Sequence, residues 1–102
     1  MDILARIKRC ALLHRVRFTH KAETERIADG LTELEVLESL VNAIRIHKTL
    51  RSTSRRRRNR REYLYIIHAP TVRGELVYTK GKLEDDNGVE TYYLLISAKL
   101  AT

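Results

Sequence analysis

Five side chains near the carboxyl terminus have the types and the spacing that RNA cleavage needs. Tyr78, Lys80 and Lys82 alternate along one β-rich segment, and Ser97 and Lys99 alternate along the next. Alternate residues of a strand point to the same face, so each set can lie together. RNA cleavage requires removal of the 2′-hydroxyl proton, protonation of the leaving 5′-oxygen, and cations that stabilise the phosphate charge. Tyrosine and lysine can fill these roles, so Tyr78, Lys80 and Lys99 are predicted catalytic residues.

The hairpin between the two segments decides whether the sets share a face. Asn87-Gly88 between β-rich runs is a strong hairpin signal, and a two- or four-residue loop pairs odd positions with even ones. The predicted core face holds Val77, Thr79, Gly81 and Leu83 with Tyr92, Leu94, Ile96, Ala98 and Leu100. The predicted open face holds Leu76, Tyr78, Lys80 and Lys82 with Tyr93, Leu95, Ser97 and Lys99. The alternative to a catalytic surface is an ordinary wet face, where Lys and Tyr are common.

An arginine run supplies most of the positive charge. Nine of the 20 Lys and Arg lie between Arg45 and Arg61, where there is no acidic residue, so the net charge of +7 is a local feature. Guanidinium groups bind phosphate oxygens in bidentate fashion, and we predict a basic loop at about 51–61 that binds nucleic acid. The predicted nucleic-acid-binding residues are Arg55, Arg56, Arg57, Arg58, Arg60 and Arg61, together with Lys82.

Two other interpretations of this run stay open. A run of like charges can be a solvated loop that binds nothing. Binding to an anionic membrane is disfavoured, because a membrane-surface helix needs apolar residues among the basic ones, and none occurs between Arg51 and Glu62.

Length and composition indicate a small intracellular globular domain. The 102 residues suit one domain, and an apolar share of 43% is ordinary for a folded chain. No apolar run approaches the ~18 residues that cross a bilayer, and Met1-Asp2-Ile3 does not begin a secretory signal. The single cysteine, Cys10, is predicted to be a buried thiol. We expect a reducing, cytoplasmic compartment and neither a metal site nor a cofactor, because His and Cys lack ligand spacing.

The first half of the chain is predicted to be helical. An apolar stripe at helical spacing predicts a first helix over about 2–14. Thr19 can cap a second helix over 20–28, which Gly30 ends, and Thr32-x-x-Glu35 is a capping box that opens a third. The predicted apolar face of the third helix is Val36, Leu37, Leu40, Val41 and Ile44.

The second half is predicted to form strands. Residues 62–69 are apolar on both faces, as in a central strand, and 75–83 and 90–100 follow as two more. Residues 16–18 can form a short edge strand, and 44–47 can begin another. The expected fold is α+β, with two or three N-terminal helices packed on one face of a three- to four-stranded antiparallel sheet, in a single domain over 1–102.

Three histidines are assigned by their positions. His20 opens the second helix and is a candidate general acid or base, although a structural role there is favoured. His68 lies in the predicted central strand and is expected to be a satisfied core histidine. His47, near the arginine run, is expected only to add polarity.

Two stretches resemble known bacterial families. Arg17-Phe18-Thr19-His20-Lys21-Ala22 with Glu25-Arg26 and Gly30-Leu31-Thr32 resembles a family of small uncharacterised domains. Gly74 to Lys80 with Leu95-Ile96-Ser97-Ala98-Lys99 resembles the end of the MqsR-type toxins, in the RelE-like group of messenger-RNA-cleaving toxins, although the hairpin here is longer. The resemblance implies a RelE-like helix-then-sheet fold and metal-free endoribonuclease activity. It also implies an acid–base role for Tyr78, a phosphate-stabilising or proton-transferring role for Lys99, and a co-encoded antitoxin.

The leading hypothesis is a metal-independent endoribonuclease (mRNA interferase) toxin of a type II toxin–antitoxin system. It would cleave RNA, free or on the ribosome, through attack by the 2′-hydroxyl group. The alternative is a non-catalytic RNA- or ribosome-binding module whose salt-sensitive binding survives loss of Tyr78 and Lys99. A domain whose basic loop binds an acidic antitoxin tail is compatible with the first hypothesis. The predicted partners are RNA and a cognate antitoxin, with no membrane.

Overall fold

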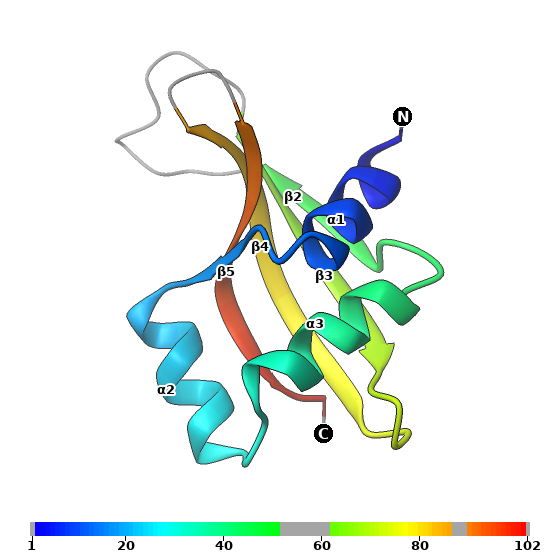
Figure 1. Ribbon diagram of the computed structural model, residues 1–102, viewed down its shortest axis with the longest axis vertical. Coiled ribbons are helices and arrows are strands. Elements are labelled where there is room, and N and C mark those ends of the chain that lie inside the picture. Colours follow the sequence, from blue (N-terminus) through cyan, green and yellow to red (C-terminus); the bar gives the residue numbers. More distant parts are fainter. Residues whose placement is uncertain (1, 52–61, 87–89, 102) are drawn as a thin grey trace.

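The computed structural model describes residues 2–51, 62–86 and 90–101, which form three helices and five strands (Figure 1). The helices are α1 (Ile3–Leu12), α2 (His20–Ala28) and α3 (Glu33–Asn42). The strands are β1 (Val16–Phe18), β2 (Lys48–Arg51), β3 (Tyr63–Pro70), β4 (Leu76–Asp86) and β5 (Glu90–Leu100). They form one sheet in the order β1-β5-β4-β3-β2. β1 runs parallel to β5, and the other neighbours are antiparallel.

The α+β class is confirmed, but the expected three- to four-stranded antiparallel sheet is wrong in strand number and in direction at one edge. The difference lies in the two short edge strands, which have three residues in β1 and four in β2. β1 was expected at an edge, but its parallel pairing with β5 depends on contacts far apart in the sequence. β3 lies between β2 and β4, as expected of a central strand.

α2 and α3 begin directly after their predicted caps, and α1 begins after Asp2, a cap that the sequence analysis did not name. The side chains of Asp2, Thr19 and Thr32 each accept a hydrogen bond from the backbone N–H three residues later. After α2, Gly30 adopts a φ of 73°, the left-handed conformation that favours glycine at a helix end. α3 ends at Asn42, earlier than its apolar stripe predicted. Ile44 is therefore 90% exposed, and its assignment to the apolar face is wrong.

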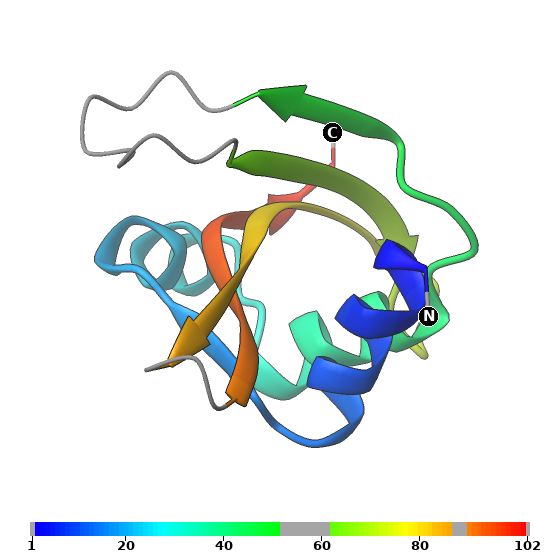
Figure 2. The ribbon, with the colours of Figure 1, turned by 90° about the horizontal axis from the view of Figure 1, so that it is seen from above.

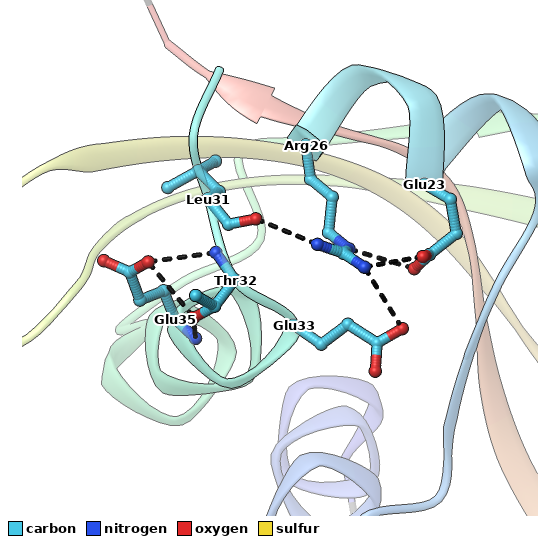
Figure 3. Close-up of polar contacts among 6 residues, drawn as sticks. All are labelled: Glu23, Arg26, Leu31, Thr32, Glu33 and Glu35. Carbon is cyan, nitrogen blue, oxygen red and sulfur yellow. Dashed lines mark hydrogen bonds and ion pairs between the residues drawn. The ribbon is translucent and has the colours of Figure 1, made fainter. Parts of the chain in front are cut away.

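Arg26 connects the end of α2 with the start of α3 (Figure 3). Its guanidinium donates to both carboxylate oxygens of Glu23, at 3.0 and 2.6 Å, and to the Leu31 carbonyl at 3.1 Å. Beside it, the Thr32 N–H donates to Glu35 Oε1 at 2.9 Å, and the Glu35 N–H donates to Thr32 Oγ1 at 3.0 Å. This capping box is the one that the sequence predicts. The two networks fix the turn between the helices.

α1 and α3 cover one face of the sheet, which curls around them (Figure 2). Tyr93, Ile7 and Leu40 are among the largest completely buried side chains. Cys10 is 4% exposed, so the predicted buried thiol is confirmed, and its burial raises the pKa of the thiol. The opposite face of the sheet is left free of these two helices.

β4 has the faces that the sequence predicts. Val77 and Thr79 are buried beneath the helices, whereas Tyr78 points to the opposite face. β5 agrees with the prediction only toward its end, where Ala98 is buried and Lys99 is exposed, and even there Ser97, expected on the open face, is buried.

The first part of β5 has its faces reversed relative to the prediction. Tyr93 and Leu95 were expected on the open face, and both are completely buried. The cause lies at the hairpin. Asp86 pairs with Glu90, so three residues separate the paired positions, whereas the prediction assumed two or four, and odd positions here pair with odd ones. Between Lys80 and Gly81 the register shifts because β5 contains one extra residue, and this β-bulge restores the predicted odd–even pairing from Ser97 onward. The Asn87-Gly88 turn lies outside the described residues.

Candidate active site

Three polar side chains form a row across the face that α1 and α3 leave uncovered. His68 on β3 lies directly opposite Tyr78 on β4, and Tyr78 lies directly opposite Lys99 on β5. The His68 and Tyr78 rings have centroids 5.5 Å apart, and Lys99 Nζ lies 5.3 Å from the centre of the Tyr78 ring. These are ordinary contact distances for a ring pair and a cation–π pair. We name these three residues the sheet row.

His47 extends the sheet row beyond β3. Its ring stacks on the His68 ring, with centroids 4.1 Å apart and planes 18° from parallel. Its backbone N–H donates to the Ile66 carbonyl at 2.8 Å, just before β2 begins. Partial burial of the ring, with the positive charges of His47 and Arg45, lowers the pKa of His68 below its ordinary value of 6.5. The His68 imidazole is therefore neutral at pH 7 and can accept a proton.

An open hollow of about 640 Å³ adjoins the sheet row. It is lined by His68, Tyr78, Lys99, Asp29, Leu100 and Ala101. Asp29 is the C-cap residue that follows α2, and its Oδ2 accepts a hydrogen bond of 2.8 Å from the Leu100 N–H. This bond gives the carboxylate a structural role at the hollow's edge. The remaining polar groups are a neutral imidazole, a phenol and an ammonium group, which suit a bound phosphate diester.

The structure brings together two of the four predicted catalytic residues, Tyr78 and Lys99, in direct contact. Lys80 lies two residues along β4 on the same face, roughly 7 Å from Tyr78 at the usual strand rise. His20 is not part of this group. It begins α2, whereas Asp29 at the hollow follows the last residue of the helix, and nine residues of helix span roughly 13 Å.

Lys82 lies in ion pairs with two carboxylates. Its Nζ is 2.8 Å from Glu84 Oε1 and 3.5 Å from Glu62 Oε2. The hydrogen bond to Glu84 is the largest cause of the raised pKa of Lys82. A phosphate would have to compete with both acids for this ammonium group, so the predicted role of Lys82 in nucleic-acid binding stays without support from its contacts.

The arginine run falls largely outside the part of the chain that the structure describes. The six predicted nucleic-acid-binding arginines lie within 52–61, outside the described residues: Arg55, Arg56, Arg57, Arg58, Arg60 and Arg61. Lys48 and Arg51, on the edge strand β2 just before this segment, are exposed. Lys48 pairs with Ile66, which in turn pairs with Lys80, so basic side chains continue along the open face.

Sequence reasoning missed His68 and His47. His68 was expected in the core, and that prediction is wrong because the residue is exposed on the open face. The turn after β3 contains the information that would have placed His68 on the open face. A tight turn centred near residue 73 places position 68 opposite position 78, as the observed pairing does. The contact of His47 with His68 had no local signal, because it depends on the path of the chain before β2.

Comparison with known proteins finds no matching family model, no matching curated protein and no matching solved structure. Within the three described segments, no group of three or more His, Cys, Asp or Glu side chains is arranged to hold a metal ion. In the same segments, no helix is long and apolar enough to cross a membrane.

Proposed function

We propose that the protein is a metal-independent endoribonuclease whose active site is the sheet row. The observation that carries the proposal is the direct contact of a neutral histidine, a tyrosine and a lysine on one open face. These three groups supply a base, a hydrogen-bond donor and a cation, which are the functions that cleavage by a 2′-hydroxyl group requires.

The order of the three residues suggests their roles. Neighbouring strands lie about 4.8 Å apart, so His68 and Lys99 are separated by about 10 Å with Tyr78 between them. A phosphate above Tyr78 would have the imidazole on one side and the ammonium group on the other. Attack and departure on opposite sides of phosphorus, as in an in-line displacement, need this arrangement.

The proposed reaction uses no group beyond these side chains. The His68 imidazole takes the proton of the 2′-hydroxyl group as the O2′–P bond forms and the P–O5′ bond breaks. Lys99 gives a proton to the leaving 5′-oxygen, and the Tyr78 hydroxyl group donates a hydrogen bond to a non-bridging phosphate oxygen. The products are a 2′,3′-cyclic phosphate and a 5′-hydroxyl group. Exchange with water restores both protonation states.

Charge outside the sheet row favours a polyanionic substrate. Lys80 lies two residues along β4 on the same face, and Lys48, which is exposed on β2, shares this face because it pairs with Ile66. The arginine run follows β2 directly in the sequence. We propose that these residues bind the phosphates next to the scissile one. Because His20 lies at the opposite end of α2 from the hollow, we propose for it the structural role that its position at the start of the helix favours.

A cleavage assay in the presence of a chelator tests the proposal. Purified protein with labelled single-stranded RNA and EDTA should yield defined fragments. Lys99→Ala should lower the rate by roughly 10²–10⁴, the usual scale for an acid–base or charge-stabilising group. Arg9→Ala is a control, because Arg9 is an exposed cation on α1, which covers the opposite face of the sheet. RNA that stays intact over many sequences would refute the activity.

The same samples distinguish the non-catalytic RNA-binding module. That alternative predicts that the protein binds RNA without cleaving it and that Lys99→Ala leaves the binding unchanged. A plot of log K against log salt concentration should fall with a slope of about 0.7 for each phosphate that the protein neutralises. A RelE-like fold, a toxin role, a cognate antitoxin and a cytoplasmic location stay predictions from the sequence and its resemblance. We include them in the proposal.

A further inference from the structure

The extra residue in β5 determines where Lys99 points. From Glu90 to Leu95, paired residues of β4 and β5 have numbers that sum to 176. From Ser97 to Leu100 the sum is 177, and Ile96 has no residue opposite it on β4. Ser97 and Ala98 are both buried, so the regular alternation is interrupted at this point. These features define a β-bulge at Ile96.

Without the bulge, Lys99 could not contact Tyr78. A continuous sum of 176 would place Ala98 opposite Tyr78 and Lys99 opposite Val77, which is completely buried. Tyr93 and Leu95 are also completely buried, so they hold the first half of β5 in its present register. The bulge is therefore what allows these core residues and Lys99 to occupy opposite faces of one strand.

One carboxylate on α2 binds the bulge directly. Glu25 Oε1 accepts a hydrogen bond of 2.6 Å from Ser97 Oγ and one of 3.2 Å from the Ala98 N–H. These residues follow Ile96 immediately and precede Lys99. α2 lies beside β5 (Figure 1), so the carboxylate reaches the bulge from outside the sheet.

The N-cap residue of the same helix binds the other side of the bulge. Thr19 Oγ1 donates to the Ile96 carbonyl at 3.3 Å, and the Thr19 N–H donates to the Leu95 carbonyl at 3.0 Å. Thr19 also caps α2 through the Ala22 N–H. The start of α2 is thus attached to the bulge, and this sets the position from which Glu25 reaches it.

The electrostatics keep Glu25 ionised. Burial of the carboxylate raises its pKa, but hydrogen bonds from Ser97 and Ala98 and the charges of Lys21 and Lys99 outweigh burial, so the pKa is lowered. An ionised carboxylate accepts stronger hydrogen bonds than a neutral group.

We propose that Glu25 is a positioning residue that holds the β5 bulge and thereby directs Lys99 onto Tyr78. It acts through Lys99 and does not contact the reacting atoms. Its effect on catalysis rests on the proposed function, whereas its effect on the Tyr78–Lys99 contact does not. Three variants separate these effects. Glu25→Ala removes the acceptor, Glu25→Gln keeps a neutral one, and Glu23→Ala removes a hydrogen-bonded carboxylate of the same helix that does not touch the bulge.

The primary measurement is the nuclear Overhauser contact between the Tyr78 ring protons and the Lys99 side-chain protons. We expect it in the parent protein, Glu25→Gln and Glu23→Ala, and expect its loss in Glu25→Ala. If Glu25→Ala does not fold, Ser97→Ala removes only the shorter hydrogen bond and should weaken the same contact. Persistence of the contact in a folded Glu25→Ala protein, or its unchanged strength in Ser97→Ala, would overturn the proposal.

RNA cleavage is the second measurement. Because a displacement of about 1 Å can cost roughly 10²-fold in rate, Glu25→Ala should lose about that factor, and Glu25→Gln should recover most of it. Equal losses in Glu25→Ala and Glu25→Gln would contradict a role through hydrogen bonding. If the parent protein cleaves no RNA, the proposed function fails, and the nuclear Overhauser measurement still decides the role of Glu25.

Discussion

Replacing Gly81 by alanine tests the sheet register on which the sheet row depends. Gly81 lies opposite Leu95, at the point where the register shifts. A Cβ atom there would lie 2.6 and 2.7 Å from two ring carbons of Tyr93, and 2.8 Å from the Leu94 carbonyl oxygen. Ordinary contacts of a Cβ atom begin near 3.4 Å, so the closest ring carbon must retreat by about 0.8 Å.

The expected loss of folding free energy depends on whether the atoms that the new Cβ would touch can move away. The Tyr93 ring is completely buried, and the Leu94 oxygen belongs to the backbone, so neither can retreat freely. Overpacking of this kind costs about 1–3 kcal/mol, and three short contacts favour the upper end. Alanine offsets about 0.5–1 kcal/mol, because glycine loses more conformational entropy in a strand. We expect a net loss of about 2 kcal/mol and a Tm lower by roughly 8–16 °C.

Thermal and urea unfolding followed by circular dichroism measure this loss. Gly74→Ala is a matched control, because Gly74 has a φ of 89° and nothing within 4 Å of an added Cβ. It should show only a backbone cost of about 1–2 kcal/mol. In a Tyr93→Leu background, Gly81→Ala should cost at least about 1 kcal/mol less, since the ring is gone. A Gly81→Ala protein within about 0.5 kcal/mol of its parent would refute the register, and with it the orientation of Lys99.

Three further predictions concern the histidine pair, the α2–α3 connection and an exposed ion pair on α2. Cleavage should rise with pH through the lowered pKa of His68, because only the neutral imidazole accepts a proton. His47→Ala exposes that ring and removes a neighbouring charge, so the pKa should rise and the acidic limb of the pH–rate profile should move to higher pH. A limb that stays in place or moves lower contradicts this reasoning. Arg26→Lys keeps the charge but loses the two-pronged bond to Glu23, so unfolding should need about 1 kcal/mol less. Lys21→Ala, which breaks an ion pair whose lysine is 61% exposed, should change stability by no more than about 0.5 kcal/mol.

The helices could be predicted from sequence because their signals are local. Thr19 and Thr32 bond to backbone groups three residues away, and these bonds decide where α2 and α3 begin. The strand bounds of β5 also match the prediction, since its ends follow from β-rich composition. The prediction for Ile44 was wrong because the stripe of apolar residues continues beyond the helix, which ends at Asn42 where Ala43 adopts an extended backbone.

The β5 bulge depends on contacts between residues that are distant in the sequence. The bulge is bound by Glu25, which lies 72 residues before Ser97. No alternation pattern reveals such a partner, so the bulge itself could not be predicted. The faces of Tyr93 and Leu95 were predicted wrongly for a local reason, because three residues separate Asp86 from Glu90 where a loop of two or four was assumed. The Tyr78–Lys99 contact was nevertheless predicted, because both residues lie in the part of the hairpin where the odd–even pairing holds.

The chemistry of the RNA ends tests the central claim most directly. The parent protein, in EDTA, should cut a single-stranded RNA to leave a 2′,3′-cyclic phosphate and a 5′-hydroxyl group. A single 2′-deoxy substitution at the cut position should abolish that cut, and His68→Ala or Lys99→Ala should slow it strongly. Equal cutting of the 2′-deoxy substrate, fragments with 5′-phosphate ends, or full activity in both variants would contradict the assignment of the sheet row as the active site.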